Sequence, residues 1–121
     1  MLAELSFIPV GGSSHLSGDI ADAVAIIRES GLPFQLTPSG TCIEGEWEQV
    51  IEVVGRARGA LLAQHQRMVT FLKLDDDRGA QDRLTRNVSS VWAHLGKESK
   101  PGKKSEGDTS QRPENLVVYD K

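Results

Sequence analysis

The 121-residue sequence predicts an α+β fold in one small domain, with two helices packed on one face of a four-stranded antiparallel sheet. Three observations predict this fold. Strand-like runs and amphipathic helical stretches follow one another in the order β-α-β-β-α-β. A Pro-Ser-Gly sequence, which is typical of a tight turn, joins the two central strands into a hairpin. The chain is also too short for two domains of ordinary size.

The N-terminal part predicts a strand, a loop and a helix. Residues 3–10, AELSFIPV, have strand composition, and the GGSS after them has loop composition. Ser17 is suited to cap a helix over residues 18–30, because its hydroxyl can accept a backbone N–H. Gly31 and Pro33 then end that helix. Its apolar residues recur at the spacing of one buried stripe: Ile20, Ala23, Val24 and Ile27.

The middle of the chain predicts the hairpin and a second helix. Strands over residues 34–37 and 41–45 flank the turn, and the helix begins near Glu46. Glu46 and Glu48 fall in its first turn, where the helix dipole stabilises negative charge. The predicted buried stripe of this helix is Trp47, Val50, Ile51, Val54 and Leu61.

The last predicted elements are a strand over residues 67–74, RMVTFLKL, and a third helix over residues 80–95. The complete order is that of a ferredoxin-like βαββαβ fold with an extra C-terminal helix. Residues 1–95 form the predicted domain, whereas residues 96–121 are polar and predict a disordered tail. The final NLVVYDK either adds an edge strand or trails from the domain, and both interpretations stay open.

Composition argues against several classes of function. Residues 1–95 carry 8 Lys and Arg against 12 Asp and Glu, so nucleic acid is not the expected partner, because phosphate binding needs clustered basic residues. No apolar run approaches the roughly 18 residues of a membrane span, and the first residues do not resemble a signal peptide. We therefore expect a cytoplasmic protein. The single cysteine, Cys42, agrees with a reducing compartment.

Alternation along the strands predicts which side chains face the helices. The inward set is Leu5, Phe7, Phe34, Leu36, Ile43, Val69 and Phe71. The outward set is Ser6, Ile8, Val10, Gln35, Thr37, Cys42, Glu44, Thr70, Leu72 and Leu74. Exposing the four aliphatic members of the outward set is unfavourable at about 25 cal/mol per Å² of apolar surface. We therefore expect a second copy of the chain to cover this face.

Polar residues at the hairpin suggest a small-molecule site. The first and third strands are antiparallel neighbours in this fold, so we expect the loops at residues 8–12 and 40–45 to meet. Their backbone donors and the hydroxyls of Ser13, Ser39 and Thr41 would then surround a small polar ligand.

Glu44 is the carboxylate that the expected elements do not explain, because it lies within a strand and no helix dipole accounts for it. A ligand-binding role and a salt bridge, for example with Lys73, both stay open. Asp75, Asp76 and Asp77 predict a solvated strand exit rather than a metal site, since consecutive residues point in different directions. We expect no metal and no cofactor.

Three segments resemble the small thiamine-binding protein family: IPVGG at residues 8–12, TPSGTCIEGEWEQV at residues 37–50 and TFLKLDDDR at residues 70–78. The similarity covers about residues 2–95. It implies a ferredoxin-like fold and a non-enzymatic protein that binds thiamine or its hydroxymethylpyrimidine part. It also implies a dimer of dimers, hence a homotetramer, with ligand sites near the subunit contacts.

Carried over by position, the resemblance assigns ligand binding to Ser39, Thr41 and Glu44. A carboxylate would accept the amino group of the pyrimidine, hydroxyls would meet its ring nitrogens, and apolar side chains would flank the ring. The apolar candidates are Ile8, Val10 and Phe34. Two alternatives stay open: an assembly protein with no small-molecule ligand, and a small enzyme acting on a heterocyclic metabolite with Glu44 as general base.

Overall fold

The structure is a computed structural model that describes residues 1–11 and 16–96. The elements follow in the order β1 (Leu2–Pro9), α1 (Leu16–Glu29), β2 (Phe34–Thr37), β3 (Gly40–Glu44), α2 (Trp47–Leu62), β4 (Met68–Asp75) and α3 (Arg83–His94). The four strands form one antiparallel sheet in the order β2-β3-β1-β4. The predicted ferredoxin-like fold with an additional helix is confirmed.

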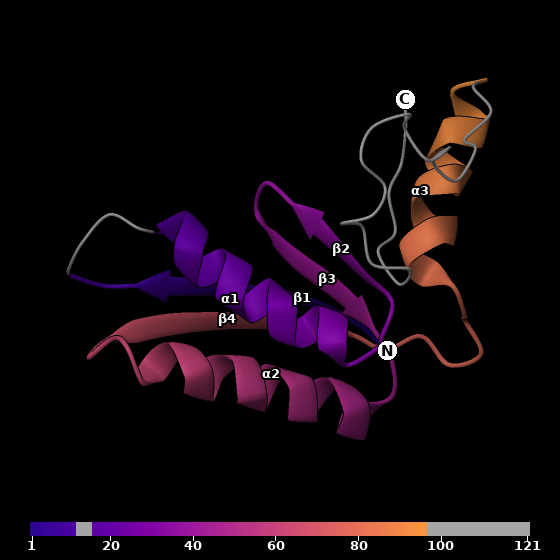
Figure 1. Cartoon of the computed structure of the whole chain (residues 1–121). Coiled ribbons are helices and arrows are strands. Elements are labelled where there is room, and N and C mark those ends of the chain that lie inside the picture. Colours follow the sequence, from indigo (N-terminus) through magenta and orange to yellow (C-terminus); the bar gives the residue numbers. More distant parts are fainter. Residues whose placement is uncertain (12–15, 97–121) are drawn as a thin grey trace.

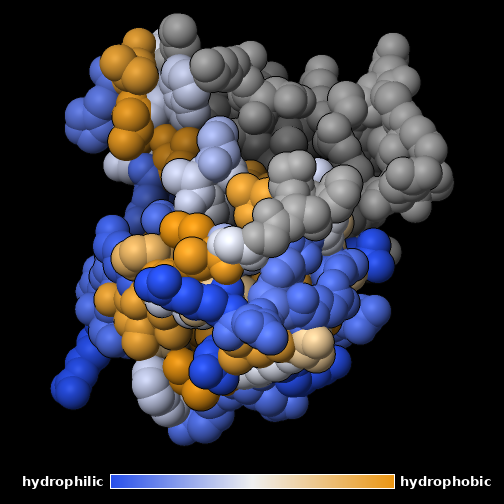
Figure 2. Space-filling model, turned by 90° about the vertical axis from the view of Figure 1, so that its left-hand side faces the viewer, coloured by the Kyte–Doolittle hydropathy of each residue, from blue (hydrophilic) through white to orange (hydrophobic). Residues whose placement is uncertain are grey.

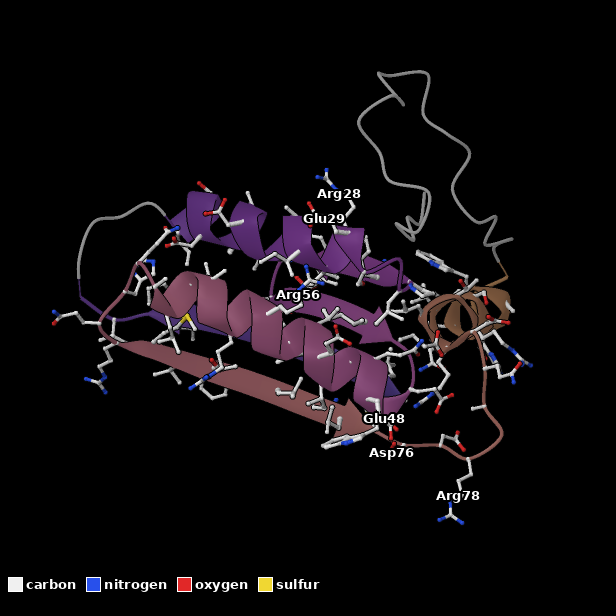
Figure 3. All side chains as sticks on the ribbon, turned by 60° about the horizontal axis from the view of Figure 1, so that its bottom comes forward. Arg28, Glu29, Glu48, Arg56, Asp76 and Arg78 are labelled. Carbon is white, nitrogen blue, oxygen red and sulfur yellow. The ribbon has the colours of Figure 1, made fainter. Side chains whose placement is uncertain are left out.

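Two of the helices cover one face of the sheet. α1 and α2 lie side by side along it, whereas α3 stands apart, beyond the end at which β3 and β4 finish (Figures 1 and 3). Among the described residues no helix covers the opposite face, which we call the open face. The described residues therefore form two layers, the helix pair and the sheet, and the open face is the other surface of the sheet.

The core lies between the sheet and the helix pair. Its largest fully buried side chains are Phe34, Ile27, Ile43, Leu61 and Val50. α2 contributes Val50, Val53, Val54, Ala57 and Leu61 at helical spacing, which confirms three members of the predicted stripe. Trp47 is different, since 53% of its surface is exposed. The prediction that Trp47 is a core residue is wrong, because the buried stripe of α2 begins one turn later, at Val50.

The starts of two helices differ from the sequence-based expectation. α1 begins at Leu16, so Ser17 lies within its first turn and does not cap it. α3 begins at Arg83 instead of Ala80. Asp82, the residue before α3, has a φ of 55°, in the left-handed region that interrupts a right-handed helix. The predicted strands are each correct to within one residue at either end.

The register of β1 and β4 corrects the predicted faces of the last strand. Residues that stand directly opposite each other in an antiparallel pair share a face. The buried Ala3 and Leu5 stand opposite Leu74 and Leu72, and both leucines pack against the core. The prediction that Leu72, Leu74 and also Thr70 face outward is therefore wrong.

Val69 and Phe71 occupy the open face in their place. Val69 stands opposite Ile8, and Phe71 stands opposite Ser6 with 58% of its surface exposed. The run RMVTFLKL has apolar residues in both phases, so apolar content alone does not set its orientation. Lys73 indicates the orientation of the strand, because its charge requires water and it shares a face with Val69 and Phe71.

Two sequence-based predictions lie outside the described residues. They are the GGSS loop beyond Gly11 and the polar tail beyond Gly96, which includes NLVVYDK. Within the part of the chain that the structure describes, no helix combines the length and the apolar character needed to cross a membrane.

Candidate functional site

A cavity of about 270 Å³ opens between α1, the second half of β1 and the β2–β3 hairpin. β1 runs well past the turn of the hairpin at this end of the molecule, and the N-terminal half of α1 lies across it (Figure 1). α1 contributes an apolar wall to the cavity, made of Leu16, Ile20, Ala23 and Ile27. The cavity therefore exists because β3 and its turn are shorter than β1.

The hairpin turn forms the polar wall of the cavity. The Thr37 hydroxyl donates to the carbonyl of Gly40 at 2.9 Å and accepts from the backbone N–H of Ser39 at 3.3 Å. The Ser6 hydroxyl of β1 donates to the carbonyl of Ser39 at 2.9 Å, which fastens the turn to β1. A Cβ at Gly40 would lie 2.9 Å from the carbonyl oxygen of Leu5, so only glycine allows this close approach.

Thr41 contributes a hydroxyl to the same wall. The residue is 6% exposed, faces the helices and stands opposite Leu5. Within the described part of the chain, no hydrogen bond involves its hydroxyl, in contrast to those of Ser6 and Thr37. A threonine hydroxyl without a partner in the protein can both donate and accept a hydrogen bond, so Thr41 offers a ligand a donor and an acceptor.

The mouth of the cavity is unusually apolar for exposed surface. Ile8 and Phe71 border it from the open face, and Leu36 borders it from the edge strand β2 with 52% of its surface exposed. Figure 2 views the molecule from the end at which β1 finishes and α1 begins, and hydrophobic side chains gather on the left of that view. The apolar surface of the mouth is therefore continuous with that of the open face.

None of the described residues that line the cavity has a titratable side chain. The charged residues labelled in Figure 3 belong to the last turn of α1, to α2 and to the segment after β4, and none of them is a lining residue. Asp19, in the first turn of α1, is not a lining residue either, and its carboxylate lies 2.9 Å from the imidazole of His65. The cavity is suited to hold a neutral ring by apolar contact and a few hydrogen bonds.

Comparison with known proteins identifies the family of the chain. The family model described as thiamine-binding protein matches residues 3–92. The chain belongs to the thiamine-binding protein family. A UPF0045 protein of Methanothermobacter thermautotrophicus is 37% identical over 92 residues, covering 74% of this chain and 93% of its own. A UPF0045 protein of Mycobacterium bovis is 33% identical over 96 residues, covering 78% of this chain and 94% of its own.

Solved structures share the fold of this thiamine-binding family member. A hypothetical protein of Methanocaldococcus jannaschii superposes with a TM-score of 0.69 at 23% identity, covering 74% of this chain and 93% of that one. A Thermotoga maritima protein, described as a candidate for thiamine biosynthesis or salvage, superposes with a TM-score of 0.66 at 24% identity. That alignment covers 74% of this chain and 96% of the other.

Three of the residues predicted to bind the ligand lie together in the structure of this protein. Ser39, Thr41 and Ile8 all line the cavity. The sequence-based reasoning missed Ser6, Leu36 and Phe71, which also line it. Phe71 lies two residues before Lys73 and therefore shares its face, so the sequence did contain a signal that Phe71 faces outward. The role of Ser6 depends on where the hairpin ends along β1.

Glu44 lies at the opposite end of β3 from the cavity. One carboxylate oxygen accepts the backbone N–H of Arg83 at 2.9 Å, and the other accepts that of Leu84 at 3.4 Å. These N–H groups belong to the first turn of α3, which has no intrahelical partner for them. The inference that no helix dipole accounts for Glu44 is therefore wrong, because Glu44 caps α3 from β3.

Val10 and Phe34 are also separate from the cavity. Phe34 is 1% exposed and belongs to the core, and the N–H of Val10 donates to the carbonyl of Arg67 at 2.9 Å. The loops at residues 8–12 and 40–45 were predicted to meet; Ile8, Gly40 and Thr41 do line one cavity, but the two segments do not pair directly, and Gly12 lies outside the described residues. Leu5 stands opposite Thr41, so Gly40 lies beside Ser6, and β1 continues several residues further to Pro9.

The polar half of the open face surrounds Cys42. Glu4 stands between Cys42 on β3 and Lys73 on β4. Burial and the carboxylate of Glu4 raise the pKa of the Cys42 thiol, and Lys73 opposes them. Among residues 1–11 and 16–96, no group of three or more His, Cys, Asp or Glu side chains is placed to hold a metal ion.

Proposed function

We propose that this protein binds thiamine through its pyrimidine ring in the cavity between α1 and the β2–β3 hairpin, without transforming it. The observation that carries the proposal is a cavity whose described lining residues are uncharged and largely apolar, with the Thr41 hydroxyl, which has no described hydrogen bond, in its wall. Membership of the thiamine-binding family supports the choice of ligand. The absence of titratable side chains among the described lining residues supports binding rather than catalysis, since acid–base chemistry needs such a group at the ligand.

The proposal includes the association of two copies through their open faces. Ile8 and Phe71 are exposed there, and both also border the cavity. A second sheet packed on this face removes their apolar surface from water and closes one side of the cavity mouth. The ligand site then lies next to a subunit contact. A homotetramer forms if two such dimers associate.

Isothermal titration calorimetry with thiamine and with hydroxymethylpyrimidine tests the ligand. Saturable heat with both compounds is the expected result. No heat with either compound at millimolar concentration removes the proposal.

Two matched variants locate the site. Thr41→Val replaces the hydroxyl in the cavity wall by a methyl group and is expected to weaken binding by about 0.5–1.5 kcal/mol. Thr70→Val makes the same change on β4, also on the helix side, at a residue that does not line the cavity. Thr70→Val is expected to keep wild-type affinity, and equal losses in both variants would contradict the assignment of the cavity.

A further inference from the structure

Among the strands of residues 1–11 and 16–96, the second half of β1 has a pairing partner on one side only. β1 pairs with β4 as far as Pro9, which stands opposite Met68. Its pairing with β3 ends earlier, at Leu5 opposite Thr41. Residues 6–9 therefore have a free edge, and this edge borders the cavity, since Ser6, Phe7 and Ile8 all line it.

The direction of the backbone groups along this edge follows from two hydrogen bonds. Val10 N–H donates to Arg67 beside β4, so the main-chain groups of even-numbered residues in β1 point toward β4. Gly45 N–H donates to the carbonyl of Met1 beside β3, so odd-numbered residues point toward β3. Phe7 is odd-numbered, and its N–H and C=O point to the side on which β3 has already ended.

Phe7 therefore presents a main-chain donor and acceptor without a described partner. The nearest link from the turn to β1 is the bond from the Ser6 hydroxyl to Ser39, which leaves the Phe7 groups unused. Pro9, the next residue with the same orientation, has no N–H to donate. Main-chain N–H and C=O groups are strong hydrogen-bonding groups, so a ligand in the cavity can pair with this donor and this acceptor.

A residue whose N–H and C=O point the same way normally exchanges both bonds with the residue opposite it. A ring that carries an acceptor nitrogen next to an amino group offers the same two complementary groups. The amino nitrogen of a 4-aminopyrimidine donates, and the adjacent ring nitrogen accepts. The volume of about 270 Å³ lies below the roughly 300–1,000 Å³ of pockets for drug-sized ligands, which favours a molecule with one ring inside.

We infer that the main-chain N–H and C=O of Phe7 determine the specificity of the cavity, by pairing with the acceptor–donor edge of a neutral aminopyrimidine. The inference rests on the proposed function and adds to it which atoms recognise the ligand. The charged parts of a larger ligand, such as a thiazolium or a phosphate ester, lie outside the cavity, because none of its described lining residues carries a charge that would neutralise them.

Amide hydrogen exchange, followed by NMR on the full ¹⁵N-labelled chain, tests the inference directly. In the free protein the Phe7 amide is expected to exchange faster than that of Leu5, its matched neighbour paired with Thr41. Saturating hydroxymethylpyrimidine is expected to slow exchange at Phe7 by about tenfold or more while leaving Leu5 nearly unchanged. A Phe7 amide as protected as Leu5 before ligand is added, or unaffected by bound ligand, overturns the inference.

Ligand analogues provide the second test. Replacing the 4-amino group of hydroxymethylpyrimidine by hydrogen is expected to weaken binding about tenfold or more, because the Phe7 carbonyl is then left unpaired. Thiamine diphosphate is expected to bind no more tightly than thiamine. Equal affinity for the deaminated analogue, or tighter binding of the diphosphate, overturns the inference while the proposed function stands. Absence of binding by both thiamine and hydroxymethylpyrimidine overturns the two together.

Discussion

The carboxylate of Glu44 in β3 caps α3 by accepting the backbone N–H of Arg83, 39 residues further along the chain, at 2.9 Å. This bond joins the sheet to a helix that has few other contacts with it. Negative charge at a helix N-terminus is also stabilised by the helix dipole. The residue with the most ligand-like appearance in the sequence thus has a structural role in the fold.

Glu44→Ala is expected to lower the free energy of unfolding by about 0.5–2 kcal/mol, the cost of losing a helix cap. Glu52→Ala, on the exposed side of α2, is the control and is expected to change it by less than about 0.5 kcal/mol. Chemical denaturation measures both. Affinity for thiamine is expected to stay at the wild-type value in Glu44→Ala, and loss of binding in a folded variant would return Glu44 to the ligand site.

The ion pair between Arg83 and Asp75, 2.8 Å long, predicts a specific pH dependence. The hydrogen bond from Arg83 holds the pKa of the Asp75 carboxyl below its ordinary value of 3.8. A carboxyl with a lowered pKa stabilises the fold above its unfolded pKa, and this contribution disappears as the pH falls through the folded pKa. Arg83 stays protonated throughout, because Asp75 raises its pKa further.

Urea unfolding of the wild type and of Asp75→Asn across pH measures this contribution. The wild type is expected to be more stable than the variant by a constant amount near neutral pH; the difference is expected to shrink as the pH falls below the ordinary Asp pKa of 3.8 and to vanish only below the lowered pKa of folded Asp75. A difference that persists unchanged at lower pH would show that the pair has no linked proton.

Because Leu72 faces the core and Phe71 lies on the open face, we expect substitution of Leu72 to affect stability and substitution of Phe71 to affect self-association. Leu72→Ala removes a side chain that packs on the core, and is expected to cost about 1–3 kcal/mol of stability, less than a fully buried leucine. Phe71→Ser changes the neighbouring residue on the open face, and is expected to weaken self-association and ligand binding with little change in monomer stability. Analytical ultracentrifugation measures self-association, and thermal unfolding measures stability. If Leu72→Ala weakened association and Phe71→Ser lowered stability, β4 would have the opposite orientation.

Cys42 is expected to react slowly with iodoacetamide at neutral pH, because burial and Glu4 raise the pKa of its thiol. Glu4→Gln is expected to shift the pH midpoint of alkylation downward. Lys73→Gln is expected to shift it upward, since Lys73 favours the thiolate. Two shifts of the same sign would contradict this electrostatic arrangement.

Local sequence patterns were enough to predict the element order, since each strand and helix has its own periodicity and turn residues. They were not enough for β4, where apolar residues occupy both phases and Lys73 alone indicates the outward side. They also failed for Trp47, because periodicity places a residue on a helix face but does not show where the core ends along the helix.

The candidate site was harder to predict, since it depends on the relative lengths of strands. Ser39 and Thr41 were identified from the hairpin motif, and both line the cavity. The position of Gly40 beside Ser6 and the free edge at Phe7 follow from the register between β1 and β3, which no local pattern encodes. The capping of α3 by Glu44 is likewise a long-range contact between elements.

Chemical-shift mapping of the ¹⁵N-labelled protein during titration with thiamine is the most direct test of where the ligand binds. The account predicts the largest shifts at the backbone amides of Phe7, Ser39 and Thr41, with little change at Glu44 and Arg83. Shifts concentrated at Glu44 and Arg83 instead, or the absence of shifts around the hairpin turn, would contradict it.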